Sequence, residues 1–572
     1  MLTQEDHDLI GPPQVTSFVT PRQDGPDMMV GGAYEGAQRF DETLALWQPS
    51  LTSADFDILN DKPLLDARVR DSIRNDSYVF AGSEIHKDNI VGSHYLLNCH
   101  PNLEVLGLDS TWAEEFQREV ESKFQVWADS PSHWIDKTMA HDFTSMVRMA
   151  AGLMVSGSEI LASSEWMSDG RPFGTAIQMI DTDRLSNPYG QWDNPNLRGG
   201  VEKNNDGVPI GYHIRKAHPV DFSSIASIDA YTWQRVPARE PWGRPKVIHI
   251  VDRWRVDQSR GVSTMVSALK EMRMTKRYRD VVLQNAVVNA TYAATIESDL
   301  PSETVMTQLG GGNVSEVAFE KMITQYAQGY LAAVGAYAKG AKNIAIDGVK
   351  IPHLFPGTKL QLRPAGGSDA MGTNFEASLL RYLSANLGVS YEQLSRDYSH
   401  VNYASFRAGA VETWKGMQSK KRRGTDAFAN QIYRLWFEEA VNAGQITSLT
   451  RKCPSIYDAN GRLGLFFDAY TQAEWIGASR GQVDELKETQ AAIQRIIFGI
   501  SSYQREAARL GMDWRKLFAQ IQREREMMDK LGILQNVSSD MMNATTGTLG
   551  QQDSGQSASG FQGGKAKGKS NG

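Results

Sequence analysis

Two short motifs near the C-terminus of the 572-residue chain have the residue types and spacing of catalytic sites. Residues 563–570, Gly-Gly-Lys-Ala-Lys-Gly-Lys-Ser, fit the expression G-x-x-x-x-G-K-[ST], in which backbone N–H groups and a lysine hold nucleotide phosphates. Residues 568–572, Gly-Lys-Ser-Asn-Gly, fit G-x-S-x-G, in which a serine nucleophile sits on a sharp strand-to-helix turn.

Neither motif has the elements that its chemistry requires. A phosphate loop follows a strand and opens a helix whose N-terminus faces the anion. The preceding residues, 543–562, are of low complexity, and the chain ends two residues after Ser570, so we expect no helix there. We interpret both motifs as chance matches in a disordered Gly/Ser/Lys tail, residues 536–572.

The other candidates for chemistry favour structural roles. The eleven histidines include no H-E-x-x-H pattern and no His/Cys cluster; His94 and His100 flank an apolar stretch, which favours core packing over metal ligation. Cys99 and Cys453 are the only cysteines and lie far apart, as expected of reduced thiols in a cytosolically made protein. We therefore expect no catalytic residues, no metal site and no cofactor.

Composition limits the classes of partner. With 41% hydrophobic residues the chain can bury a substantial core, and its length corresponds to roughly three to four domain-sized units. The formal net charge of −7 argues against a dedicated high-affinity duplex binder, because such proteins neutralise many phosphates. It does not exclude DNA that passes close by. No apolar run approaches the roughly 18 residues of a membrane span, and the N-terminus is unlike a signal peptide, so we expect no membrane partner.

The most informative segment is a polar loop between two helical patterns. An apolar residue recurs every fourth position before the loop, which predicts a helix that ends at Gly388. The residues of this stripe are Phe375, Leu379, Leu383 and Leu387. A second helical pattern begins at Tyr403. The loop between them consists of Ser395, Arg396, Asp397, Tyr398, Ser399, His400, Val401 and Asn402. Its polarity alone would also fit an ordinary connection between helices.

The second helix carries a basic run that has three interpretations. Its cationic residues are Arg407, Lys415, Lys420, Lys421, Arg422 and Arg423. They could follow DNA phosphates, or form ion pairs with acidic helices of a neighbouring subunit. The third interpretation is a solvated helix face, which is the commonest role of such runs.

Patterns elsewhere predict a mixed α+β organisation. Residues 1–45 lack periodicity and are expected to form a mobile arm. A helical region begins at 68–76, and further helices are expected over 111–128 and 142–154. Residues 156–251 show short alternating segments broken by turn residues. The clearest predicted strands are 177–180, 211–214 and 247–251.

The C-terminal half combines long helices with a smaller insert. Residues 262–300 contain no Gly or Pro, which predicts a long helix that we expect to stop near Ala294. The insert that follows, about 297–372, is predicted to be α/β. The helix–loop–helix extends to about Ala443. A short β region is then predicted over 462–467, followed by helices over 483–499 and 501–531, the second broken at Gly511.

In this order the elements resemble those of the lambda-type portal proteins of tailed bacteriophages. The resemblance covers roughly residues 50–535 and is strongest over 388–407, whose helix–loop–helix is similar to the segment that projects a loop into the DNA tunnel. Other segments that resemble the family are 65–71, 180–185, 199–202, 247–249, 258–263, 356–357, 475–477 and 483–488. The chain departs from the family pattern at Asp484-Glu485, where Asp-Pro is common, and at Asn402-Tyr-Ala-Ser405, where Asn-Tyr-Ser-Ser is common.

The resemblance implies a portal fold with wing, stem, clip and crown in a cyclic oligomer. The implied divisions are an N-terminal arm at 1–45, wing at 46–260, stem helix at 261–296, clip at 297–372, second stem helix at 373–393, tunnel loop at 394–402, a further wing part at 403–475 and crown at 476–535. Such a chain would form a homododecameric ring at the unique capsid vertex of the virion, around a channel for double-stranded DNA.

The resemblance also implies partners. These would be the terminase large subunit and head-completion or connector proteins at the clip, the major capsid protein at the wing, and a scaffold or prohead protease during assembly. Two alternatives remain open at this stage. One is a nucleotide-driven packaging enzyme, which would need a genuine phosphate loop; the other is a cytosolic helical scaffold without DNA traffic.

Overall fold

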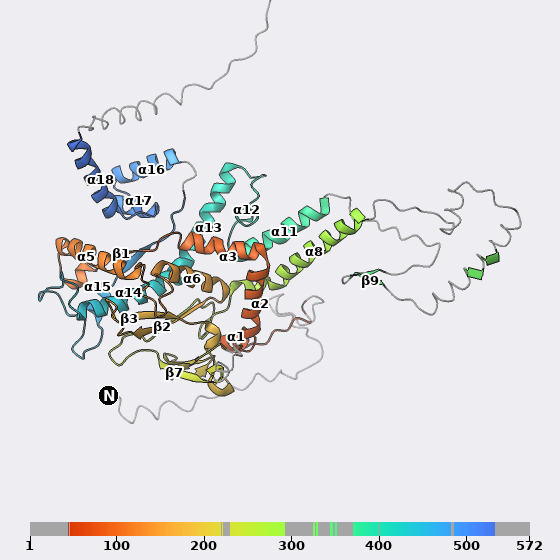
Figure 1. The fold of residues 1–572 in the computed structure, drawn as a ribbon, viewed down its shortest axis with the longest axis horizontal. Helices are drawn as coiled ribbons and strands as arrows, with labels where there is room; N and C mark the ends of the chain where they lie inside the picture. The colour runs from red at the N-terminus through yellow and green to blue at the C-terminus, as the bar shows by residue number, and fades with distance from the viewer. Residues whose placement is uncertain are drawn as a thin grey trace, which may run out of the picture.

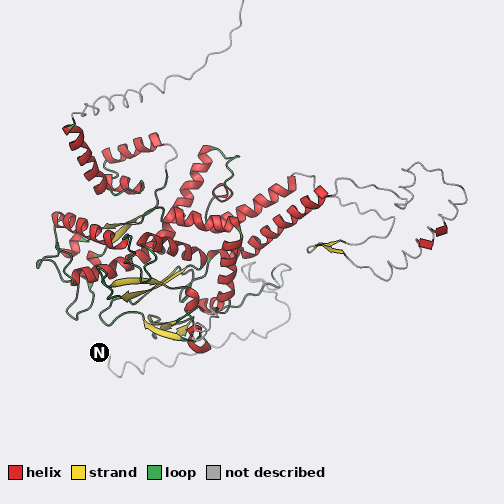
Figure 2. Cartoon of the chain, viewed as in Figure 1, coloured by secondary structure: helices red, strands yellow, loops and turns green. Residues whose placement is uncertain are grey.

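The structure, a computed structural model, describes residues 44, 46–218, 220, 229–291, 370–399, 401–481 and 485–531, with short pieces at 324–325, 328–329, 344–346 and 349–351. Figure 1 shows a body of helices and sheets, from which two long helices project side by side and above which a group of three helices stands. The mixture of helices and strands (Figure 2) agrees with the expected α+β class. The predicted N-terminal arm except Leu44, most of the predicted clip, His400 and both C-terminal motifs lie outside the described residues.

Residues 54–156 of the body are mostly helical. They are α1 (Ala54–Leu59), α2 (Lys62–Asn75), α3 (Ser77–Ile90), α4 (Leu103–Leu106), α5 (Ser110–Ala128) and α6 (Phe143–Ser156). Side-chain caps fix several of the starts: the carboxylate of Asp109 accepts a hydrogen bond from the backbone N–H of Trp112 at 2.9 Å, and that of Asp142 accepts one from Ser145 at 2.7 Å. The predicted helices over 111–128 and 142–154 are confirmed.

The hydrophobic core forms where α5 meets α14 (Thr425–Asn442). Phe116, Val120 and Phe124 recur at every fourth position of α5 and are buried, because this spacing places them on one face. The ring of Phe124 packs edge-on against Trp436 of α14, with centroids 5.3 Å apart. Burial of such large side chains stabilises the body by roughly 1.5–3 kcal/mol each.

The strands form small antiparallel sheets. One is the three-stranded sheet β3 (Thr175–Met179), β2 (Glu159–Trp166) and β8 (Val247–Val251), which lies under the helices. A four-stranded sheet has the order β4 (Leu197–Arg198), β5 (Val201–Lys203), β6 (Pro209–Arg215) and β7 (Trp233–Pro237). Two pairs complete the described strands: β1 (Leu96–Cys99) with β11 (Ala473–Ile476), and β9 (Ile344–Ile346) with β10 (Val349–Ile351). The prediction of a β-rich unit over 156–251 is confirmed.

The projecting pair consists of α8 (Leu269–Thr291) and α11 (Ala370–Leu387). A 3-10 turn, Thr264–Ala268, precedes α8. The rings of Tyr278 and Phe375 meet edge-on at 5.1 Å between the two helices. The predicted end of α11 is confirmed, since Gly388 adopts a left-handed φ of 71° that favours glycine. The predicted apolar stripe is partly wrong: Leu383 and Leu387 are buried, but Phe375 is 47% exposed and Leu380, rather than Leu379, is the buried residue one turn earlier.

After α11 the chain forms α12 (Tyr391–Ser395), α13 (Tyr403–Arg423) and α14. The short β region predicted over 462–467 is mostly wrong: Leu463 forms an isolated antiparallel bridge with Tyr457, but Leu465–Tyr470 forms helix α15. Phe467 and Tyr470 are buried on one helical face, whereas Leu465 is 70% exposed, so three consecutive apolar residues do not mark a strand here. The last described helices are α16 (Glu485–Ile497), α17 (Tyr503–Arg509) and α18 (Trp514–Lys530). The predicted break at Gly511 is confirmed.

Across the described residues, none of the helices combines the length and the apolar character needed to cross a membrane.

Candidate functional site

The polar loop after the projecting pair is shorter than predicted. Ser395 belongs to α12, whose start is fixed by a capping box: the Ser390 hydroxyl accepts from the Gln393 N–H at 3.3 Å, and the Gln393 side chain accepts from the Ser390 N–H at 3.2 Å. Leu394 anchors this short helix in the core. The loop proper is therefore residues 396–402, and we call it the 396–402 loop.

Local hydrogen bonds brace the 396–402 loop. Arg396 has a left-handed φ of 59° and caps α12 by donating its N–H to the Glu392 carbonyl at 2.8 Å. The carboxylate of Asp397 accepts from the backbone N–H of Ser399 at 3.0 Å and from its hydroxyl at 2.6 Å. On the far side, the Asn402 side chain accepts from the Ser405 N–H at 2.8 Å, which starts α13.

An aromatic contact joins the tip of the loop to α13. The ring of Tyr398 lies edge-on to Phe406, with centroids 5.3 Å apart, yet Tyr398 remains 48% exposed. Residues 396–399 are all exposed. Arg396 and Asp397 carry opposite charges, so residues 396–399 have no net charge that would bind phosphates tightly. The Ser399 hydroxyl and the Tyr398 phenol can still make weak polar contacts.

The basic run on α13 divides into buried and exposed residues. Lys420 lies 3.0 Å from Nε2 of His86 and donates to the Leu387 carbonyl at 3.2 Å, so it joins α13 to α3 and to the end of α11. Burial lowers the pKa of Lys420. Burial, followed by the nearby charge of Lys420, lowers the pKa of His86 to about 4. His86 is therefore neutral at physiological pH, and its Nδ1 lies 2.7 Å from the Gly82 carbonyl.

Three further cations of the run also have partners within the chain. Lys421 is 6% exposed and contacts Asp426 at 2.7 Å and the Trp475 carbonyl at 2.8 Å. Arg423 pairs with Asp252 at 3.0 Å, and Arg407 lies 3.6 Å from Glu488 of α16. Lys415 and Arg422 remain exposed. These two are the residues of the run with the freest access to a phosphate or to a neighbouring subunit.

A buried ion cluster lies where the body meets the projecting pair, and sequence reasoning missed it. The Glu159 carboxylate of β2 forms ion pairs with Arg260 at 2.9 Å and with Lys62 of α2 at 3.0 Å. It also accepts a hydrogen bond from the backbone N–H of Gly261 at 2.8 Å. Arg260 also donates to the carbonyls of Leu185, Gly199 and Thr182 at 2.6–2.8 Å. Burial acts to raise the pKa of Glu159, but the charges of Arg260 and then Lys62 hold it well below its usual value.

The sequence offered one signal for this cluster. Residues 258–263, which include Arg260, resemble the corresponding segment of the portal family. Lys62 and Glu159 lie far from Arg260 in the sequence, so no periodic pattern connects them to it. The cluster fixes the chain just before α8, so its role is structural.

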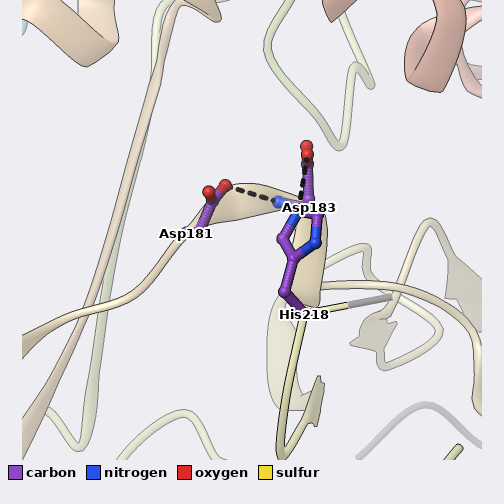
Figure 3. Close-up of side chains that lie close together, drawn as sticks. All are labelled: Asp181, Asp183 and His218. Carbon is purple, nitrogen blue, oxygen red and sulfur yellow. Dashed lines mark hydrogen bonds and ion pairs between the residues drawn. The ribbon is translucent and has the colours of Figure 1, made fainter. Parts of the chain in front are cut away.

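Asp181, Asp183 and His218 are the one group of three possible metal ligands among the described residues. Figure 3 shows the imidazole of His218 against the Asp183 carboxylate, with Nε2 3.3 Å from Oδ2. Arg70 of α2 already supplies a cation, since its guanidinium binds Asp183 in two places and contacts Asp181 at 3.3 Å. Burial acts to raise the pKa of Asp183, but the bond to Arg70 outweighs it and lowers the pKa. We interpret the group as a salt-bridge cluster.

With this geometry established, comparison with known proteins identifies the family. Residues 40–421 match the family model described as phage portal protein, lambda family. The chain belongs to the lambda family of phage portal proteins. This match contains the projecting pair, the 396–402 loop and most of α13.

Curated portal proteins extend the similarity over nearly the whole chain. The portal protein of Escherichia phage N15 is 33% identical over 494 residues, covering 86% of this chain and 89% of the relative. Portal protein B of Escherichia phage lambda is 33% identical over 512 residues, covering 87% and 91%. Among solved structures, a chain from the neck of a native gene transfer agent particle, computed with C12 symmetry, matches with 13% identity, a TM-score of 0.34, and coverage of 78% of this chain and 92% of that chain.

Membership confirms the function and location expected from the sequence. The chain is a portal protein of a tailed phage, and portal proteins are virion components found at the portal vertex of the capsid. The alternative of a cytosolic scaffold is not supported.

Proposed function

We propose that twelve copies of this chain form the portal ring through which the phage genome is packaged and ejected, and that the 396–402 loop lines the channel. The observation that supports this role most directly is the construction of the loop. Its residues 396–399 are exposed and braced by local hydrogen bonds, and the loop connects α12, which follows the projecting helix α11, to the long helix α13. Such a loop is rigid enough to hold a position beside DNA and neutral enough to let it slide.

In this proposal the described elements divide as the family resemblance implied. The projecting pair α8 and α11 is the stem, and the body from α1 to β8 with α13, α14, α15 and β11 is the wing. Helices α16–α18 belong to the crown. The segment between the two stem helices, of which only short pieces are described, is the clip.

The proposed partners follow the same division. The clip would dock the terminase large subunit during packaging and head-completion or connector proteins afterwards, and the wing would face the major capsid protein. A scaffold or prohead protease would act during assembly. ATP hydrolysis is assigned to the terminase, so the ring itself is a structural conduit without a cofactor.

Weak contacts repeated around a ring explain how the loop could guide DNA without holding it. Phosphate contacts by Lys and Arg produce strong, salt-dependent binding. Residues 396–399 carry one cation and one anion, and most of the basic run on α13 is paired within the chain. A ring of such loops would touch the duplex at many points, each of which is readily broken.

Deletion of residues 399–402 tests the role of the loop. We expect ring assembly to remain intact, since the packing of α11 and α14 does not involve these residues, while the yield of DNA-filled heads falls. Rings would be counted by negative-stain microscopy and packaged DNA by nuclease protection. A matched control replaces Lys452 and Arg451, two exposed residues of the body, with Ser. Normal numbers of filled heads from the deletion variant would disprove the role of the loop.

A further inference from the structure

A groove on the surface of the body exposes two tryptophans beside several carboxylates. It has a volume of about 910 Å³ and is lined by the end of β2, the turn between β7 and β8, the last turns of α14 and the segment around Tyr457. Trp166 and Trp242 in its lining are 62% and 41% exposed. We call it the Trp166–Trp242 groove. Its volume lies in the range of sites that bind organic ligands and exceeds the volume of a single small ion.

Both indole rings are held in place although they are exposed. A Cβ on Gly174 would lie 2.7 Å from the Trp166 ring, so this ring rests directly on the backbone just before β3. The Trp242 ring donates from Nε1 to the Glu438 carboxylate at 3.0 Å, and the Trp242 carbonyl accepts from the Leu463 N–H at 3.3 Å. Aromatic side chains fixed in this way lose little conformational entropy when a partner covers them.

The carboxylates of the groove outnumber its cations. The charged residues in the lining are Glu165, Glu240, Glu438, Glu439, Arg244 and Lys246. Both cations are already paired, since Arg244 lies 2.8 Å from Glu438 and Lys246 lies 3.2 Å from Glu165. Two carboxylates therefore remain.

These two carboxylates, Glu240 and Glu439, form no ion pair with any residue that the structure describes. Glu439 accepts a hydrogen bond from the Thr175 N–H at 2.8 Å, which orients its carboxylate but supplies no countercharge. Arg239 precedes Glu240 in the sequence but does not line the groove, and its guanidinium donates to the Gly243 carbonyl at 3.4 Å. The groove thus combines uncompensated negative charge with exposed aromatic rings.

This combination favours a cation that carries an apolar chain. Guanidinium and ammonium groups bind over aromatic rings within about 6 Å and pair with carboxylates. The chain itself provides an example, because the guanidinium carbon of Arg244 lies 5.9 Å from the centre of the Trp166 ring while the same group pairs with Glu438. The excess of negative charge would repel DNA phosphates, and a small inorganic cation would leave the indole rings uncovered.

We propose that the Trp166–Trp242 groove binds a peptide segment of a partner protein that presents arginine or lysine side chains. The cations pair with Glu240 and Glu439, and their methylene chains lie against the exposed indole rings. Rigid aromatic anchors with complementary charge are the usual centre of a protein interface. This binding is separate from the proposed channel, because the groove contains no residue of the 396–402 loop, α8 or α11.

A fluorescein-labelled peptide of alternating arginine and glycine tests the groove on the full chain. Fluorescence anisotropy should show saturable binding, which a peptide with citrulline, the neutral isostere of arginine, should not reproduce. Glu240→Gln combined with Glu439→Gln should raise the Kd about tenfold at low salt, because both uncompensated charges are removed. Glutamine at position 439 can still accept the Thr175 N–H, so the fold should be kept. Trp166→Ala should raise the Kd about threefold or more.

Matched controls separate the groove from general attraction to an acidic protein. Glu114→Gln combined with Glu115→Gln changes the net charge equally on an exposed part of α5, and Trp254→Ala removes a tryptophan that is 68% exposed but outside the groove. Both should leave the Kd within about twofold of the original value. Equal weakening by these controls, or equal binding of the citrulline peptide, would overturn the proposal.

A reactive peptide locates the bound segment. In a Cys453→Ser background, where Cys99 is buried, Ala443→Cys places a thiol at an exposed position of the groove lining. A bromoacetyl group on the arginine peptide should alkylate this thiol about tenfold faster than the same group on the citrulline peptide, since binding raises its local concentration. Ser110→Cys, at the exposed start of α5, should show no such preference. An equal preference at both positions would contradict binding in the groove.

Other occupants of the groove would give different results. Residues 554–572 contain three lysines and no Asp or Glu. If their removal tightens peptide binding, the C-terminal segment of the chain itself fills the groove, and the assignment to a partner protein fails. Binding by single chains that disappears in assembled rings would assign the groove to a neighbouring subunit, and the assignment fails again. Binding that is unchanged by both truncation and assembly supports a partner protein.

Discussion

Single charged residues in this portal protein hold distant segments together where the sequence shows only isolated charges. Lys420 and Lys421 sit in a basic run that would suit DNA, yet both ammonium groups are occupied inside the chain. Arg260 is the extreme case, since it is buried and has an anion and three carbonyls as partners. The charges that hold the fold are thus the ones with many partners and little exposure.

Replacing Arg260 with Met should destabilise the chain by about 3–5 kcal/mol, because it leaves Glu159 buried with only part of its compensating charge. The expected measurement is the free energy of unfolding from urea titration. The control is Arg74→Gln, which removes an exposed pair with Asp71 and should destabilise the chain far less, because solvent screens exposed pairs. Equal losses for the two variants would contradict the account of the buried cluster.

His86 should make stability depend on pH. Its pKa of about 4 in the folded chain lies below the value near 6.5 expected when unfolded. Between these values the unfolded chain binds more protons, so stability is full above about pH 6.5 and falls by up to about 3 kcal/mol as the pH drops toward 4. His86→Leu, although less stable at pH 7, should lose less stability over that range. An unchanged slope in urea titrations at pH 7, 6, 5 and 4.5 would assign the pH dependence to other groups.

At the scale of elements, the joint between body and stem depends on close backbone approach. A Cβ on Gly261 would lie 2.5 Å from the Gly157 carbonyl oxygen and 2.6 Å from that of Ser158. Backbone atoms cannot move aside as a side chain can, so Gly261→Ala should destabilise the chain and disturb the start of α8. Hydrogen exchange should show faster exchange in residues 262–275.

The matched control is Gly416→Ala in the middle of α13, where an added Cβ meets nothing. Alanine is favoured over glycine inside a helix, so this variant should be more stable by about 0.5–1 kcal/mol. Destabilisation by both variants would show that backbone approach at Gly261 is not the cause.

Elements with a clear period could be predicted from the sequence, and those fixed by distant partners could not. The spacing of Phe116, Val120 and Phe124 alone identifies α5. By contrast, Leu465-Phe-Phe467 has no period within three residues, and only packing of Phe467 and Tyr470 into the core decides for a helix. The 396–402 loop was located by its resemblance to the family. Its predicted start at Ser395 was wrong because that residue belongs to helix α12, which begins at a capping box. The pairing of Lys421 with Asp426 and Trp475 has no sequence signal, because its second partner lies 54 residues away.

At the scale of the whole molecule, stability and assembly are assigned to different parts. The body has a large core that extends from α2 to β11 and includes the base of the stem, and a second, smaller core built mainly from strand residues. Among residues 485–531, only Glu506 and Ala507 are buried. Such a division suits a ring subunit, in which surfaces left apolar in the single chain become covered on assembly.

Truncation after Arg480 separates these two roles. The body should keep its unfolding free energy to within about 2 kcal/mol, because helices α16–α18 are attached mainly by exposed or partly exposed polar contacts, each worth about 0–1 kcal/mol. Ring formation, measured by native mass spectrometry at matched concentration, should weaken because the exposed apolar residues of α16 and α18 are gone. The comparison is truncation after Asn442, which removes β11 and with it Trp475 from the core and should prevent stable folding. A body that unfolds after this truncation would show that helices α16–α18 stabilise the fold of the single chain and are not confined to assembly.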